Sequence, residues 1–114
     1  MPYVHLSVPN ALTAEEKHAL CEAIGPLMPL LPGKNRQNTM MHIEDSCYLE
    51  MGEDGEPCLF LEVRLFKKSP EESKEAFAKA ICELLEQKLG VKQTRIYMNF
   101  IEMDAWVSGG NYRC

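Results

Sequence analysis

The residue with the clearest chemical potential is Pro2, next to the start of the chain. If the initiator Met1 is removed, Pro2 becomes the first residue and its nitrogen is a secondary amine. An α-amine titrates near ~7.7–8.0, and burial disfavours its charged form, so an ordered and desolvated amine is a free base at neutral pH. The strand-forming residues that follow would hold this terminus in place. The alternative is that Pro2 is simply the residue after Met1.

Two further groups of polar side chains have weaker signals. Lys34 and Arg36 lie in a polar connector, where a solvated position is the simpler interpretation. Arg36 and Arg64 make binding of a second carboxylate conceivable, since an arginine can hold a carboxylate through two hydrogen bonds. His5 and His42 fall on predicted strands and are expected to be structural, because a single histidine carries little specific signal.

The cysteines give no metal or disulfide pattern. There are five, an odd number at irregular spacing, with no CxxC pair and no Cys/His pair at zinc spacing. We therefore expect no metal centre, and small buried thiols in a reducing compartment. His18 lies on a polar helix face and is expected to be solvated.

Length and charge narrow the class of protein. The chain has 114 residues, enough for a single domain over residues 1–114, and its net charge of −5 argues against nucleic acid or an anionic membrane as a partner. No apolar stretch is long enough to span a bilayer, and the start of the chain has no signal-peptide pattern. We expect a cytoplasmic protein.

The first half of the chain predicts a strand, a helix and another strand. A strand is expected over about residues 3–8. Thr13 and Glu16 form the pattern of a capping box at a helix start, and an apolar stripe at helical spacing follows. Prolines within that stripe remove backbone donors, so the helix should kink or end near Ile24. Residues 39–44 are predicted to form the next strand.

The second half repeats this order. Residues 47–51 are a candidate short strand, and residues 58–66 form the longest predicted strand. Ser69-Pro70-Glu71-Glu72 has the pattern of a second capping box, with proline where its missing N–H is harmless. The helix that follows should end at Gly90. Residues 95–103 are the last predicted strand, and no element is predicted in the tail beyond it.

Together these elements predict an α/β (α+β) fold built from a tandem β-α-β repeat. The two units cover about residues 2–45 and 58–103. Two helices can cover only one face of a four-stranded mixed sheet. The opposite face mixes apolar and polar side chains, which suggests that chains associate through it. Its polar members include Glu62, Arg64, Tyr97 and Asn99.

The chain resembles the tautomerase superfamily, and its length and motifs are those of the macrophage migration inhibitory factor (MIF) family. The residues that carry the resemblance are Pro2, the Gly33-Lys34 pair before His42, Glu56-Pro57-Cys58, Cys82-Glu83-Leu84-Leu85, and Arg95-Ile96-Tyr97-Met98-Asn99-Phe100-Ile101-Glu102-Met103.

The resemblance implies a homotrimer with active sites between subunits, and keto–enol tautomerisation of an α-keto acid such as phenylpyruvate without any cofactor. Pro2 would be the general base. Lys34 would hold the substrate carboxylate and keep the amine neutral. Phe66 would line the pocket, while Tyr97 and Asn99 would come from the adjacent subunit.

The chain also departs from the family pattern. Cys58 is present, but Leu61 stands where a second cysteine would be, so no thiol oxidoreductase activity is inferred. The tail has Gly109-Gly110-Asn111 in place of the usual Gly-Trp-Asn, with Trp106 upstream.

Two alternative functions stay open. The protein could be a cytokine-like module that binds a protein receptor and has a vestigial tautomerase site, or an enzyme that acts on an unsaturated or dicarboxylic acid. The resemblance also admits export without a signal peptide.

Overall fold

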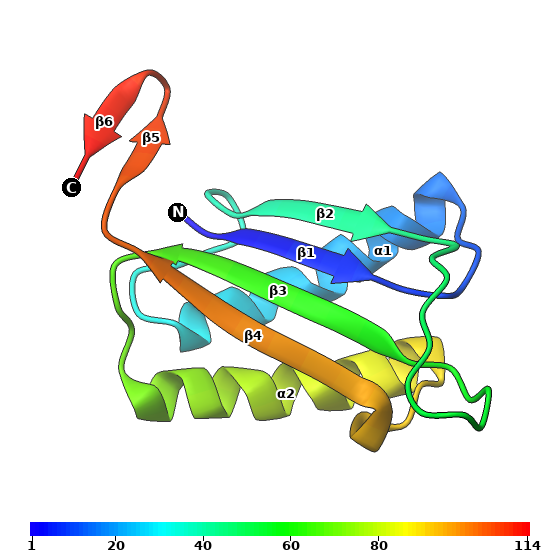
Figure 1. Cartoon of the computed structure of the whole chain (residues 1–114). Helices are drawn as coiled ribbons and strands as arrows, with labels where there is room; N and C mark the ends of the chain where they lie inside the picture. The colour runs from blue at the N-terminus through cyan, green and yellow to red at the C-terminus, as the bar shows by residue number, and fades with distance from the viewer.

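The computed structural model describes all 114 residues and shows one mixed sheet with both helices on the same face (Figure 1). This confirms the predicted fold class. The main elements are β1 (Tyr3–Ser7), α1 (Ala14–Ile24), β2 (Met40–Glu44), β3 (Leu59–Phe66), α2 (Glu71–Leu89), β4 (Ile96–Met103), β5 (Trp106–Ser108) and β6 (Asn111–Arg113), with two 3₁₀ turns, η1 (Gly25–Leu30) and η2 (Gln93–Arg95).

The strand order is β2-β1-β3-β4, so the two β-α-β units meet at the centre of the sheet. β1 pairs with β2 in parallel, β3 pairs with β4 in parallel, and β1 and β3 are antiparallel. A parallel pair needs a crossover, and α1 and α2 supply one to each unit. The strand that carries the N-terminus is therefore central and is hydrogen-bonded along both edges.

The core lies between the sheet and the helices, on the face that the alternation in β3 predicts. Every second residue of β3 is buried, while those between them are half-buried or exposed. Large aliphatic and aromatic side chains of both layers fill this space, and the fully buried ones include Val4, Leu6, Ile24, Leu61, Val63, Leu65, Phe77, Ile81 and Leu85.

Helix α1 begins and ends where its sequence predicts. The Thr13 hydroxyl accepts a hydrogen bond from the amide of Glu16 at 3.1 Å, and the Glu16 carboxylate accepts one from the amide of Thr13 at 2.9 Å. The helix ends at Ile24, and the proline-containing residues that follow form the tighter η1 turn.

Helix α2 is capped differently from the prediction. Pro70 stands at its N-cap, and no side chain caps the helix, so the predicted Ser69 capping box is wrong. The Glu102 carboxylate from β4 instead accepts the Ser69 amide at 2.6 Å and the Lys74 ammonium at 2.9 Å. Glu102, which is distant in sequence, thus takes the bond to the Ser69 amide that the predicted capping box assigns to Glu72. The C-terminal stop at Gly90 is confirmed, with φ at 70°.

Two segments differ from the expected strands. Residues 47–51 form no strand, since no neighbouring strand of this chain pairs with them. Conversely, the tail forms the β5–β6 hairpin, which Figure 1 shows projecting from the sheet near the N-terminus. Its turn at Gly109 and Gly110 has φ of 58° and 82°, a conformation that glycine adopts without strain.

Neither α1 nor α2 has the length and apolar character that a membrane-spanning helix requires.

The two helix starts give a matched test of what holds them. We expect Thr13→Ala to lower the free energy of unfolding by about 1 kcal/mol, because it removes a capping hydroxyl. Ser69→Ala should change it by less than about 0.5 kcal/mol, because the hydroxyl of Ser69 caps nothing. Urea unfolding followed by circular dichroism measures both. Equal losses for the two variants would contradict this account of α2.

Candidate active site

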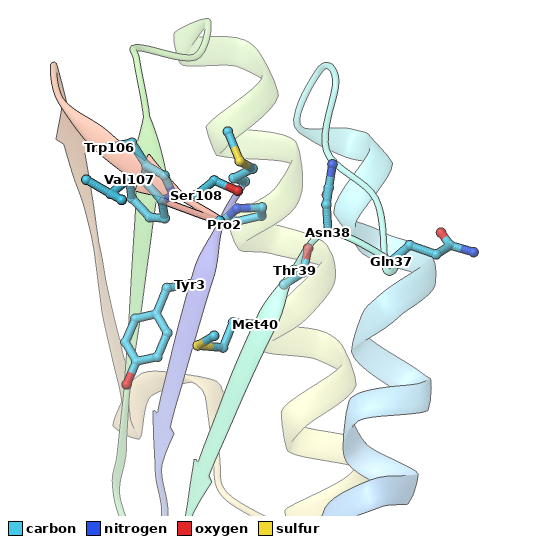
Figure 2. Close-up of a pocket in the computed structure, with 11 residues that line it drawn as sticks. Pro2, Tyr3, Gln37, Asn38, Thr39, Met40, Trp106, Val107 and Ser108 are labelled. Atoms are coloured by element: carbon cyan, nitrogen blue, oxygen red, sulfur yellow. The ribbon is translucent and has the colours of Figure 1, made fainter. Parts of the chain in front are cut away.

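Pro2 lines a cavity of about 580 Å³ at one end of the sheet. It is buried, and its carbonyl accepts a hydrogen bond from the amide of Met40 at 3.0 Å, which anchors the terminus to β2. Figure 2 shows Pro2 between Asn38 and Thr39 on one side and Trp106 and Ser108 on the other. The full lining is Met1, Pro2, Tyr3, Gln37, Asn38, Thr39, Met40, Trp106, Val107, Ser108 and Gly109.

One wall of the cavity is a loop held by its own polar side chains. The amides of Asn35 and Asn38 each donate to the side-chain oxygen of the other, at 3.3 and 3.0 Å. The buried Thr39 hydroxyl donates to the carbonyl of Asn35 at 2.6 Å. These bonds close the loop immediately before β2 and bring Thr39 beside Pro2.

The opposite wall is the β5–β6 hairpin. Trp106 pairs with Arg113, and Ser108 pairs with Asn111. Directly opposed residues share one face of a hairpin, so Arg113 lies on the same face as Trp106. The hairpin therefore brings an indole and a guanidinium to the end of the chain where Pro2 lies.

The terminal amine has a strongly altered acidity. Partial burial, reinforced by the positive charges of Lys34 and Arg113, lowers the pKa of the Met1 amine from its usual 8.0 to about 6. Burial is the largest cause, because the ammonium loses hydration, and the two cations act in the same direction. An amine in this environment is mostly unprotonated at neutral pH and can accept a proton or attack an electrophile.

Lys34 and Phe66 are predicted site residues, and neither of them lines the cavity of the single chain. Lys34 is close enough to the terminal amine to lower its pKa. Phe66 is half-buried at the end of β3, near the same end of β1 because Tyr3 pairs with Arg64, but it does not line the cavity. The ammonium of Lys67 lies 5.2 Å from the centre of the Phe66 ring.

Tyr97 and Asn99, the other two predicted site residues, lie far from Pro2 of the same chain. Both are exposed on the sheet face that the helices leave uncovered. Tyr97 pairs with Phe60, which in turn pairs with Ser7. Ser7 is five residues beyond Pro2 in an extended strand, a distance of about 16 Å along the sheet. One chain alone therefore does not bring these side chains to the amine.

The two arginines considered for a second carboxylate are engaged elsewhere. The side chain of Arg36 packs so closely on Gly25 that a Cβ there would lie 2.5 Å from its Cδ. Arg64 pairs with Glu62 at 2.6 Å. Neither arginine lines the cavity.

Most walls of the cavity could not be predicted from the sequence. The sequence predicts no part in the site for residues 37–39 and none that is defined for residues 106–109, because their positions depend on a loop closure and on a hairpin. The Gly109-Gly110 pair was the one available signal for that hairpin. Arg113 could not be placed near the terminal amine without it.

Comparisons with known proteins agree on the family and the fold. The family model described as macrophage migration inhibitory factor (MIF) matches residues 1–112. A macrophage migration inhibitory factor from Meriones unguiculatus is 26% identical over 105 residues, covering 92% of this chain and 84% of the relative.

Solved structures agree on the fold. The structure of Leishmania major MIF2 superposes with a TM-score of 0.89 at 17% identity, covering 98% of this chain and 97% of the other. The structure of Pt0534 inactivated by 2-oxo-3-pentynoate superposes with a TM-score of 0.79 at 20% identity, covering 95% of this chain and 93% of the other.

The acidity of the terminal amine can be tested with one substitution. We expect Lys34→Gln to raise the pKa of the Met1 amine from about 6 while leaving it below 8.0, because burial remains when the cation is removed. Chemical-shift titration of the N-terminal residue in isotopically labelled protein that retains Met1 measures this value. Lys92→Gln, at a 71% exposed lysine, is the matched control and should change nothing. An unchanged pKa in Lys34→Gln would remove Lys34 from the site.

Proposed function

Because the chain belongs to the macrophage migration inhibitory factor family, whose model matches residues 1–112, we propose that it is a tautomerase with Pro2 as its general base. The proposed reaction is keto–enol tautomerisation of an α-keto acid such as phenylpyruvate. The observation that carries the proposal is the cavity at the N-terminus, where an amine has a pKa of about 6. A base with a pKa near the working pH is the most effective proton carrier.

Removal of Met1 would place the Pro2 nitrogen at the terminus. Pro2 is itself buried, and it lies one residue closer than Met1 to the start of β1 at Tyr3. Burial, the main cause of the lowered pKa at Met1, would therefore act on Pro2 as well. With Met1 retained, the proline nitrogen is part of an amide and cannot act as a base.

In the proposed reaction the substrate carboxylate binds the Lys34 ammonium. The neutral Pro2 nitrogen takes the hydroxyl proton of the enol and delivers a proton to the adjacent carbon, which gives the keto form. The reverse reaction begins with removal of the carbon proton and builds negative charge on the carbonyl oxygen. A nearby cation or hydrogen-bond donor must stabilise that charge. The amine ends each turnover as it began, so no cofactor is consumed.

The other side chains of the site require a second subunit. We propose a homotrimer in which Phe66 forms an apolar part of the pocket and the neighbour supplies Tyr97 and Asn99. The single chain supports this arrangement in two ways. Tyr97 is 59% exposed, and it lies about 16 Å along the sheet from Pro2 of its own chain.

The substrate class fits the charges at the cavity. Lys34 and Arg113 both lower the pKa of the terminal amine, so they make this end of the sheet favourable for an anion. A protein of the same fold, Pt0534, is inactivated by 2-oxo-3-pentynoate, which is itself a 2-oxo acid. The proposed substrates carry the same carboxylate and adjacent carbonyl.

The direct test replaces the base. In protein whose mass confirms the loss of Met1, Pro2→Ala should reduce kcat/KM for phenylpyruvate tautomerisation by about 10²–10⁴-fold, the usual contribution of a positioned acid–base group. Pro26→Ala, at an exposed proline of the η1 turn, is the matched control and should keep the wild-type rate. A wild-type rate in Pro2→Ala would exclude Pro2 as the base. No turnover of any α-keto acid by the wild type would instead favour a binding module.

The shared site can be tested by mixing subunits. Lys34→Ala and Tyr97→Ala should each be weakly active, since each lacks part of every site. After unfolding and refolding together in equal amounts, roughly one quarter of the sites in cyclic trimers should combine an intact Lys34 with an intact Tyr97. Tautomerase activity should recover to about that fraction of wild type. If the refolded mixture stays at the mean of the two variants, the site does not lie between subunits.

A further inference from the structure

A second group of chemically capable side chains lies on the uncovered face of the sheet, apart from the cavity. It consists of His5 on β1 with His42 and Glu44 on β2, and we call it the His-Glu cluster. β1 and β2 are parallel and in register, so His5 and His42 are direct partners. Glu44 is two residues after His42, and strand alternation places it on the same face.

The three side chains are already close together. One ligand atom from each lies within 4.8 Å of the others. His5 Nε2 is 2.8 Å from Glu44 Oε1. The two imidazole rings are stacked, with centroids 4.1 Å apart and planes 3° apart. In the single chain the side chains of His5 and Glu44 are 24% and 51% exposed, so a small ion can reach them there.

Tyr3 contacts this cluster. It lies two residues before His5 in β1, so strand alternation places both side chains on the same face. Its hydroxyl lies 2.8 Å from Nδ1 of His42. If Nδ1–H donates to the Tyr3 oxygen, the lone pair on Nε2 of His42 is free to bind a metal. A metal-binding histidine usually has such a partner on its other nitrogen, which fixes the tautomer and the orientation of the ring.

We propose that His5, His42 and Glu44 form a site for a divalent first-row transition metal of the zinc class. Two imidazoles and one carboxylate are ligands that suit Zn²⁺, and three protein ligands leave a coordination position open. The carboxylate also offsets part of the charge of the ion. Binding requires the two rings to turn out of their stack, because parallel rings do not aim both lone pairs at one point.

The surrounding charges are compatible with a cation. Glu62 of β3 is the cross-strand partner of His5, and its carboxylate pairs with Arg64 at 2.6 Å. The guanidinium of Arg64 lies 5.5 Å from the centre of the Tyr3 ring, on the far side of β1 from the β2 ligands. Glu44 is paired with no lysine or arginine. Its ion-pair partner is His5, itself a proposed ligand, and a bound metal would replace that contact.

The experiment is a titration of the intact protein with Zn²⁺ alone, followed by isothermal calorimetry. We expect one ion per chain. His42→Ala and Glu44→Gln should each weaken binding by more than about tenfold, because each removes a ligand. Tyr3→Phe should weaken it by about 10–100-fold, because it removes the hydrogen bond that orients the His42 ring. His18→Ala is the matched control: this exposed histidine also pairs with a glutamate, Glu22 at 3.5 Å, and its loss should leave binding unchanged.

The same titration with Co²⁺ identifies the ligand atoms. Imidazole and carboxylate ligands should give visible d–d bands without a sulfur-to-cobalt charge-transfer band. Cys47→Ser is needed as a control, because this thiol lies 3.4 Å from the carbonyl of Glu44, and it should bind like wild type. Absence of Zn²⁺ binding, binding that survives His42→Ala and Glu44→Gln, or binding lost in Cys47→Ser would overturn the proposal. None of these results depends on tautomerase activity, so this proposal and the proposed reaction can fail separately.

Discussion

The position of the N-terminus in the middle of the sheet is the constraint on which the rest of the structure depends. A chain terminus normally frays, because few contacts offset the entropy of ordering it. Here the first strand is hydrogen-bonded along both edges, and Val4 and Leu6 are fully buried against the helices. Displacing the terminus would therefore disrupt the core. The same burial that orders the terminal amine also lowers its pKa, so ordering and chemical activation have one cause.

The alternation of the strands divides the molecule into a structural face and a chemical face. Residues that point toward the helices are apolar and buried, and changing them would open cavities in the core. Residues that point away carry the polar and aromatic groups, including Tyr97, Asn99 and the His-Glu cluster. Substitutions on the outer face can therefore change its chemistry without changing the core, since side chains on opposite faces of the sheet do not contact one another.

Local patterns in the sequence predicted the parts of this fold that local forces decide. The alternation in residues 58–66 indicated the buried face correctly, and the Thr13 capping box forms because both of its partners lie within one turn. Ser69 has the same local pattern but a different outcome, because Glu102 reaches its amide from a strand that lies 33 residues further along the chain. Residues 47–51 lack a strand partner within the chain, and propensity alone does not make a strand.

For the candidate site, the sequence could indicate single residues with suitable chemistry but not the residues that surround them. Pro2 is a candidate from its place in the chain and from the properties of an amine, and the structure places it in the cavity lining. The walls around it could not be predicted, because they depend on the reciprocal bonds of Asn35 and Asn38 and on the turn at Gly109.

The His-Glu cluster shows the same limit more clearly. His5 and His42 were each expected to be structural, and 37 positions of sequence separate them. Only the in-register pairing of β1 and β2 makes them neighbours, and a shift of that register by one residue would send one ring into the core. Tyr3 lies at the junction of the two regions, since it lines the cavity beside Pro2 and contacts His42. The strand that orders the terminal amine therefore also carries His5 and the Tyr3 contact to His42.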